Sequence, residues 1–129
     1  MQFLMQHCLA DSASRFPEKT ALVQDERRYS YSQTEEITSN IAQALVSSGI
    51  SRGERGGVFL DHCLEQAFSF FAILKAGAVY VPMNSQLKGL QVDHIARDCH
   101  LSGLIIDSER LAMIRDYSRE WDFLKCIVL

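Results

Sequence analysis

The sequence predicts an α/β fold in which a parallel sheet is flanked by helices and is preceded by an N-terminal helix and a β-hairpin. Two observations support this prediction. Across residues 53–129, short and almost wholly apolar strands alternate with amphipathic helices, which is the pattern of a parallel sheet covered on both faces. Across residues 1–52, the order is instead helix, hairpin, helix. We therefore expect two parts within one domain that fills residues 1–129.

The first part begins with a predicted amphipathic helix over residues 2–15, which Pro17 ends. Its inward-facing residues should be Leu4, Cys8, Leu9, Ala13 and Phe16. Two short strands at 20–23 and 28–31 then predict a β-hairpin with a loose polar turn. Because this pattern differs from the rest of the chain, we expect the hairpin to form a second sheet or to pack at the edge of the first.

The helix that follows has the clearest boundaries in the chain. Ser32 and Glu35 have the spacing of a capping box, in which each side chain bonds the other residue's backbone N–H. Gly49 supplies the left-handed conformation that ends a helix. An apolar stripe at helical spacing predicts the buried face: Ile37, Ile41, Ala44 and Leu45.

The second part should contain four parallel strands joined by three helices. A polar turn at 51–57 precedes it, and Asp61 can cap the helix that ends at Gly77. The later helices are expected at 90–99, with Val92, Ile95, Ala96 and Cys99 inward, and at 109–119. The strands should be centred near Phe59, Val81, Ile105 and Val128.

Composition and charge exclude several classes of function. The net charge is −3, and the arginines at 27, 28, 52 and 55 are interleaved with Glu26 and Glu54, so we expect neither a nucleic-acid nor an anionic-membrane partner. No signal peptide and no apolar run of membrane-spanning length is visible. The wide spacing of the cysteines favours a cytoplasmic protein. The cysteines lack a Cys-x-x-Cys pair and should be reduced and buried: Cys8, Cys63, Cys99 and Cys126. Three of them adjoin histidines, but neighbouring helical residues diverge too far to form a metal site.

For each candidate catalytic residue, a structural role is favoured. The glycines at 53, 56 and 57 precede a strand, whereas phosphate loops follow one. Ser69 lacks the glycine elbow of a hydrolase, and neither His62 nor His94 has a paired nucleophile. Lys75 could bind phosphate, but its position in a last helical turn suits the helix dipole. We therefore predict no catalytic, cofactor-binding or metal-binding residue in this chain.

Three segments resemble motifs of the adenylate-forming superfamily, which comprises acyl-CoA synthetases, peptide-synthetase adenylation domains and luciferases. Residues 74–84 read Leu-Lys-Ala-Gly-Ala-Val-Tyr-Val-Pro-Met-Asn and resemble the second core motif. Residues 29–34 resemble the first core motif, with Gln33 and Thr34 in place of Glu and Leu, and residues 16–23 resemble the opening strand. The segments occur in the family's order and spacing over residues 10–110.

The resemblance implies an enzyme that activates a small-molecule carboxylate. The carboxylate attacks the α-phosphate of ATP to form an acyl-adenylate and release pyrophosphate, and the thiol of CoA then displaces AMP. ATP, Mg and CoA would be used by a longer parent protein, because the family's catalytic parts lie downstream of this region. The apolar strand at 126–129 has no polar tail, which also favours a piece of a longer protein. We expect this piece to be inactive and to self-associate through residues 68–71 and 126–129.

The sequence also leaves three other functions open besides an acyl-CoA ligase: an adenylation domain, an interaction module and a receiver domain. Asn84 favours an acyl-CoA ligase, whereas an adenylation domain that serves a carrier protein more often has Asp there. A non-catalytic α/β interaction module would share only the ancestry of the motifs. A receiver domain would need an acidic cluster beside a phosphoacceptor, and Asp61 and Asp107 do follow predicted strands but lack the supporting acidic pair.

Overall fold

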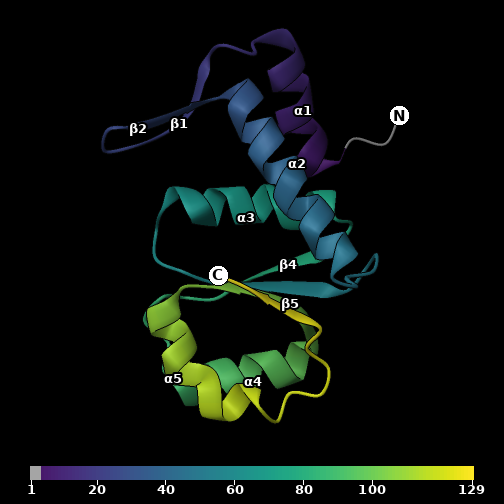
Figure 1. Cartoon of the computed structure of the whole chain (residues 1–129), viewed down its shortest axis with the longest axis vertical. Coiled ribbons are helices and arrows are strands. Elements are labelled where there is room, and N and C mark those ends of the chain that lie inside the picture. Colours follow the sequence, from purple (N-terminus) through teal and green to yellow (C-terminus); the bar gives the residue numbers. More distant parts are fainter. Residues whose placement is uncertain (1–3) are drawn as a thin grey trace.

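Five helices and six strands lie within residues 4–129, the part of the chain that this computed structural model describes (Figure 1). No helix in this part is long and apolar enough to cross a membrane. The elements are α1 (Met5–Arg15), β1 (Thr20–Gln24), β2 (Arg27–Ser30), α2 (Tyr31–Ser47), β3 (Arg55–Phe59), α3 (Leu64–Lys75), β4 (Val79–Pro82), α4 (Gly89–Cys99), β5 (Leu101–Ile106), α5 (Ser108–Ser118) and β6 (Cys126–Val128).

The central sheet confirms the predicted fold class. Its four strands lie in the order β4-β3-β5-β6, and every neighbouring pair is parallel. Helices α2 and α3 lie on one face and helices α4 and α5 on the other, so the fold is layered (Figure 1). One buried cluster fills the α2 and α3 side around Val58 and Ile73, and a second fills the α4 and α5 side around Phe59 and Ile114.

Strand β3 begins at Arg55, which corrects the predicted polar turn over residues 51–57. Gly56 and Gly57 are buried within the strand. A Cβ atom at Gly57 would lie 2.8 Å from a methyl group of Leu101, and one at Gly56 would lie 3.1 Å from Ile73. Neighbouring side chains lie so close to β3 on both faces that a residue larger than glycine would clash at either position. The sequence pattern does not indicate these distant neighbours.

Helix α2 begins two residues before its predicted start. Its N-cap is Ser30, whose side chain accepts a hydrogen bond from the backbone N–H of Gln33 (3.1 Å), while the Gln33 side chain accepts from the N–H of Ser30 (2.8 Å). The capping box assigned to Ser32 and Glu35 is therefore wrong. Gln in the third helical position serves a capping box as Glu does, so the sequence contained two overlapping signals.

The buried face of α2 also differs from the predicted apolar stripe. Ala44 is exposed, Ile37 and Ile41 are half-buried, and the fully buried residues are Thr34, Thr38, Ala42 and Leu45. The two threonine hydroxyls are satisfied inside the helix, because they donate to the carbonyl groups of Ser30 and Thr34 at 2.8 Å. This bonding lets polar residues form a close helix–helix contact that hydrophobic periodicity does not detect.

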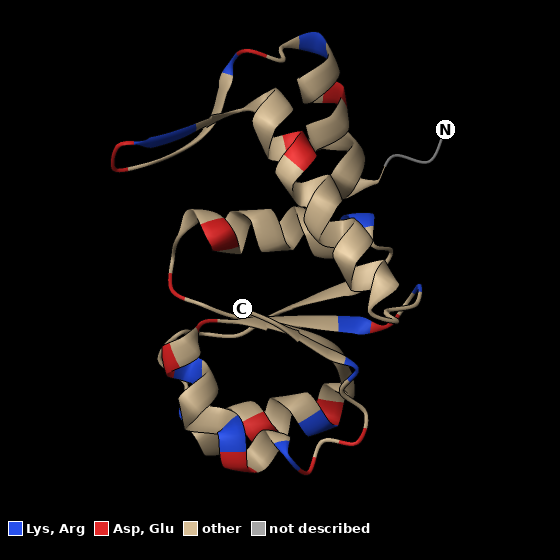
Figure 2. Ribbon diagram, in the orientation of Figure 1, with Lys and Arg blue, Asp and Glu red and all other residues tan. Residues whose placement is uncertain are grey.

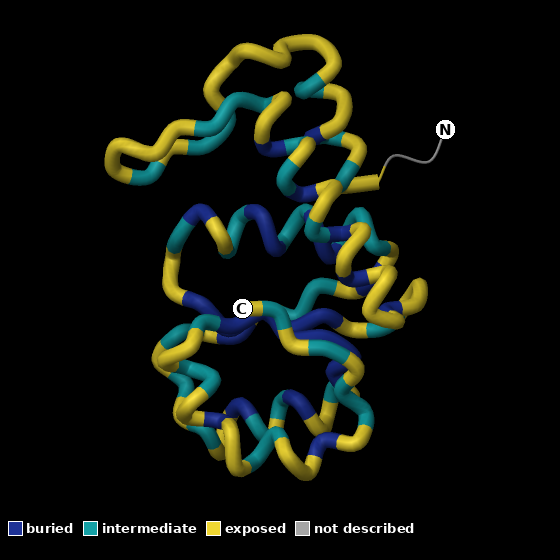
Figure 3. Tube along the Cα trace, viewed as in Figure 1, coloured by how far each residue is buried: buried dark blue, intermediate teal, exposed yellow. Residues whose placement is uncertain are grey.

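The N-terminal helix and hairpin form the outer part of the molecule. Strands β1 and β2 pair antiparallel in a sheet of their own, as predicted. The hairpin is attached to α3 by an ion pair of Arg27 with Glu65 (2.7 Å) and by an edge-to-face contact between Tyr29 and Phe68. Helix α1 is largely exposed, and Leu9 is its one fully buried residue (Figure 3).

Two details of the first helix and of α3 correct the sequence predictions. Leu4 and Phe16 are about half exposed rather than inward, and the start of the predicted helix at residues 2 and 3 lies outside the described part. Helix α3 has Cys63 rather than Asp61 at its N-cap, without a side-chain bond. The predicted glycine stops after α2 and α3 are confirmed by the positive φ angles of Gly49 (102°) and Gly77 (80°). The domain division near residue 52 stays a prediction.

Candidate functional site

The carboxyl ends of β3, β4 and β5 are where ligands usually bind in a parallel α/β sheet. Strand β3 leads into α3 on one face, whereas its neighbour β5 leads into α5 on the other. Neighbouring strands whose connections leave toward opposite faces create a crevice between their ends. In this chain Asp61, which follows β3, and Asp107, which follows β5, flank that point.

Arg110 occupies this crevice and joins three loops. Its guanidinium donates to Asp107 Oδ2 (2.6 Å), pairs with Asp61 Oδ1 (2.9 Å) and contacts the carbonyl oxygen of Ser85 (3.4 Å). It also lies over the ring of Phe59, 5.5 Å from the centroid, and only 11% of its side chain is exposed. The bond from Arg110, followed by one from Ser85, lowers the pKa of Asp61 below its ordinary value. The network therefore fixes the ends of β3, β4 and β5 relative to one another.

The charge of the network does not suit phosphate. Two carboxylates surround one guanidinium, so the cluster carries a net negative charge and the cation is already paired. A neighbouring cavity of about 240 Å³ lies between the ends of β3 and β4, lined by Leu60, His62, Gln66, Pro82, Met83, Asn84 and Ser85. No cation lines it, and its volume is below the range usual for cofactor sites.

Three polar residues that the sequence singles out have structural partners in this part of the molecule. His62 Nδ1 lies 3.2 Å from Gln66 Oε1, and buried Ser69 donates to the carbonyl oxygen of Glu65 (2.6 Å). Asn84 accepts a hydrogen bond from the backbone N–H of Gln86 (2.9 Å), which turns the chain after β4. His94 lies on the exposed surface of α4. His62 and Asn84 line the same small cavity, whereas Ser69 and His94 lie elsewhere in the structure.

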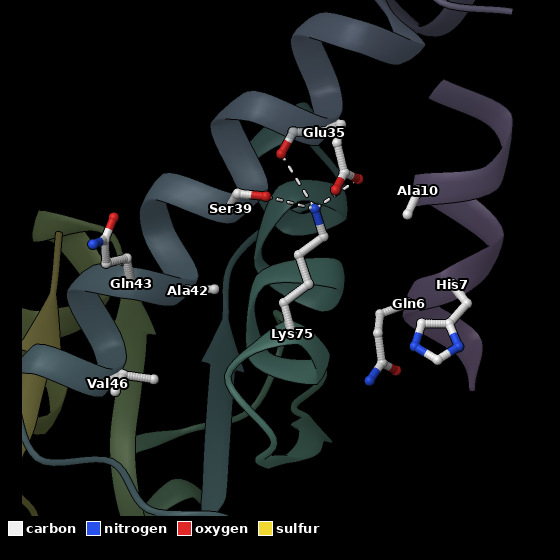
Figure 4. Close-up of a pocket in the computed structure, with 9 residues that line it drawn as sticks. All are labelled: Gln6, His7, Ala10, Glu35, Ser39, Ala42, Gln43, Val46 and Lys75. Carbon is white, nitrogen blue, oxygen red and sulfur yellow. Dashed lines mark hydrogen bonds and ion pairs between the residues drawn. The ribbon is translucent and has the colours of Figure 1, made fainter. Parts of the chain in front are cut away.

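Lys75 is the most extensively bonded cation, and it ties helix α3 to helix α2 (Figure 4). Its ammonium forms an ion pair with Glu35 Oε2 (2.7 Å) and donates to Thr38 Oγ1 (2.8 Å) and Ser39 Oγ (3.0 Å). Only 11% of the Lys75 side chain is exposed. Its position in the last turn of α3 agrees with the predicted dipole role, but the contacts show a second role, as a clamp between two helices.

The cleft above Lys75 has a volume of about 550 Å³ and opens between α1 and α2. Gln6 and His7 of α1 face Glu35, Ser39 and Gln43 of α2 across it. Since Lys75 is paired with α2, its charge is not available to a phosphate group in the cleft. The lining also includes Ala10, Ala42 and Val46, so the cleft is a mixed polar and apolar groove between α1 and α2 that offers no free cation to a nucleotide.

A third hollow is almost wholly apolar. It measures about 290 Å³ and lies beside β5 and β6 on the side of the sheet that carries α3, lined mainly by Ile41, Leu60, Phe68, Ile105, Val128 and Leu129. Both later helices, α4 and α5, lie on the opposite face. Leu60, Phe68 and Ile105 are buried, so the exposed part of this lining is mainly Leu129, which is 74% exposed.

The cysteines are free but half-buried rather than fully buried as predicted. Burial raises the pKa of the Cys63 and Cys126 thiols, which makes them less reactive. Within residues 4–129, no group of three or more potential ligands is placed to hold a metal ion.

The site network that the sequence analysis does not predict is centred on Arg110. Its sequence signal is an Asp at a helix N-cap followed three residues later by Arg, which is too common to identify a site by itself.

Comparisons with known proteins agree on one family. The family model described as AMP-binding enzyme matches residues 9–125. Syringomycin synthase SyrB1 of Pseudomonas syringae pv. syringae is 38% identical over 81% of this chain, and crotonobetaine/carnitine–CoA ligase of Salmonella typhimurium is 30% identical over 85%. The chain spans only 17% and 22% of the length of these relatives. The crystal structure of anthranilate CoA ligase AuaEII with anthranoyl-AMP superimposes with a TM-score of 0.92 at 29% identity, over 98% of this chain and 25% of that one.

Proposed function

Because the chain belongs to the family of AMP-binding enzymes, which are adenylate-forming ligases, we propose that it is the N-terminal scaffold of an ATP-dependent acyl-CoA ligase. The complete enzyme would activate a small-molecule carboxylate as an acyl-adenylate, with ATP and Mg, and transfer the acyl group to CoA. The observation that carries the proposal is the family match over residues 9–125, together with a fold shared along nearly the whole chain with a CoA ligase.

The role proposed for this chain is mechanical support. Adenylation needs positive groups and N–H donors placed around the charge that develops on the α-phosphate. Lys75 and Arg110 are each only 11% exposed, and each is bound to carboxylates of this chain. We infer that they hold the sheet and its flanking helices in place, while the groups that contact nucleotide belong to other parts of the enzyme.

One observation favours a carrier protein, in place of CoA, as the acceptor of the acyl group. The relative with 38% identity is a syringomycin synthase rather than a CoA ligase. Asn84 was expected to favour CoA, but its side chain accepts a hydrogen bond from the N–H of Gln86 (2.9 Å), and an Asp carboxylate could accept the same bond. The structural role of Asn84 therefore suits both branches, and a carrier protein is the alternative acceptor to CoA.

The test uses the complete enzyme and the 129-residue chain in parallel. We expect the complete enzyme to catalyse carboxylate-dependent exchange of pyrophosphate into ATP, with a panel of fatty and aromatic acids as substrates. We expect the chain alone to show no exchange and no tight binding of ATP. Release of AMP on addition of CoA would support the CoA branch, whereas release only with a carrier protein would support the alternative. An enzyme that never forms an adenylate would refute the proposal.

Two narrower proposals accompany this function. Residues 1–52 would form a peripheral part with the hairpin, and residues 53–129 the parallel α/β unit. The complete enzyme would work in the cytoplasm, where ATP and CoA are available. Limited proteolysis that cuts first near residue 52 would support the division, and fractionation of cells that express the enzyme would test its location.

A further inference from the structure

The Arg110 network lies where a parallel α/β sheet usually binds its ligand. Ligands bind outside the carboxyl ends of the strands, at the point where neighbouring connections leave toward opposite faces of the sheet. Asp61 and Asp107 flank this point, and Arg110 bonds to them at 2.9 Å and 2.6 Å. Charges of both signs therefore gather at the carboxyl ends of the strands (Figure 2).

Asp107 holds Arg110 at two points. As the N-cap of α5, its Oδ1 accepts a hydrogen bond from the backbone N–H of Arg110 (2.8 Å), and its Oδ2 accepts one from the guanidinium (2.6 Å). The guanidinium is thereby directed across the strand ends. There it lies over the ring of Phe59 and reaches Asp61 after β3 and the carbonyl oxygen of Ser85 after β4. One side chain thus links segments that follow three neighbouring strands.

Ser85 connects this network to the small cavity between the ends of β3 and β4. It lines the cavity together with His62 and Asn84. Its carbonyl oxygen lies 3.4 Å from the guanidinium of Arg110, and its side chain also bonds to Asp61. A change in the position of Arg110 would therefore move one wall of the cavity.

The network is better suited to fixing geometry than to adding stability. Burial disfavours the charged guanidinium, but bonds to Asp107 and Asp61 outweigh this effect and raise the pKa of Arg110 above its ordinary value. In buried ion networks the cost of removing water offsets much of the attraction, so apolar residues of similar volume often stabilise a fold as well or better. A planar guanidinium instead favours one arrangement, because its donors form a rigid fork.

We propose that Arg110 is a positioning residue for the carboxylate-activating reaction of the complete enzyme. It acts through the loops after β3, β4 and β5, and it contacts neither the carboxylate substrate nor ATP. This inference rests on the function proposed above and adds to it the residue through which this chain sets the shape of the reacting site.

The test compares two buried cations of the complete enzyme. Arg110 and Lys75 are each 11% exposed and paired with carboxylates, but Lys75 lies between α2 and α3 and precedes β4. In carboxylate-dependent exchange of pyrophosphate into ATP, Arg110→Met should lower kcat by about ten- to a hundredfold, because a displacement of about 1 Å can cost that much. The KM for ATP should stay unchanged, since Arg110 does not bind ATP. Lys75→Met, assayed well below its unfolding temperature, is the matched control and should keep the kcat of the wild type.

Chemical rescue separates a positioning role from a general loss of folding. Arg110→Ala leaves a space that a guanidinium ion can fill. Guanidinium chloride, at concentrations that do not unfold the wild type, should restore part of its kcat, whereas sodium chloride should not. Arg110→Met should not be rescued, because the Met side chain fills the same space.

Three results would overturn this inference and leave the proposed function in place. They are an Arg110→Met enzyme with the kcat of the wild type, a Lys75→Met enzyme that loses as much as Arg110→Met, and an Arg110→Ala enzyme that guanidinium does not restore. A wild type without any exchange would overturn the proposed function and this inference together.

Discussion

Replacing Lys75 by Met tests whether this residue is a clamp between α2 and α3. Met keeps most of the aliphatic stem but removes the ammonium that pairs with Glu35 Oε2 (2.7 Å) and donates to Thr38 Oγ1 (2.8 Å) and Ser39 Oγ (3.0 Å). Removing one partner of a fully buried ion pair costs about 3–5 kcal/mol. The Glu35 side chain is 30% exposed and can partly regain water, so the cost should be smaller. We expect a loss of about 2 kcal/mol in the free energy of unfolding.

The assay is urea unfolding followed by circular dichroism, with the exposed Lys88→Met as the matched control. The control should change the free energy of unfolding by no more than about 0.5 kcal/mol, as is usual for surface substitutions. In the double variant Lys75→Met/Glu35→Met, the Glu35 carboxylate is also removed. The double variant should therefore lose less stability than the sum of the two single variants, by about 1–2 kcal/mol. A single-variant loss no larger than that of the control, or strictly additive effects, would refute the clamp.

Three further outcomes follow from contacts elsewhere in the sheet. Gly57→Ala should cost about 1–3 kcal/mol in urea unfolding, because the new Cβ would lie 2.8 Å from Leu101. Arg110→Met should speed hydrogen exchange in the loops after β3, β4 and β5, whereas Arg119→Met on the exposed end of α5 should not. Bonds from a lysine, a serine hydroxyl and a backbone N–H lower the pKa of Glu54 from 4.5 to about 2. Because the pKa of Glu54 is lower in the folded chain, its carboxylate contributes to the free energy of unfolding. This contribution is complete above pH about 4.5 and is lost as the pH falls toward 2. Glu54→Gln should therefore make the free energy of unfolding depend less steeply on pH in this acid range.

Local signals in the sequence predicted the framework of the fold well. Short apolar strands that alternate with helices led to the parallel sheet, and Gly49 and Gly77 marked helix ends because their positive φ angles favour glycine. Each of these signals depends on a few neighbouring residues. The sequence also correctly indicated the family, because its motifs lie in strands and turns whose geometry requires particular residue types.

Features that depend on distant partners were not predictable. Thr34 and Thr38 are buried because α3 packs closely against α2, and no periodicity of apolar residues reports that contact. Gly57 lies inside a strand because side chains of β5 and the side chain of Met83, which directly follows β4, approach it closely, although glycine by itself suggests a turn. The Arg110 network joins the ends of three strands that are far apart in the sequence, so it was visible only once the sheet order was known.

The central claim is that this chain supports an adenylate-forming enzyme without binding the nucleotide itself. Carboxylate-dependent exchange of pyrophosphate into ATP tests it most directly when the complete enzyme and the 129-residue chain are measured side by side with the same acids. We predict exchange by the complete enzyme and none above background by the chain. Exchange catalysed by the chain alone would reveal a nucleotide site within residues 1–129 and would contradict the account.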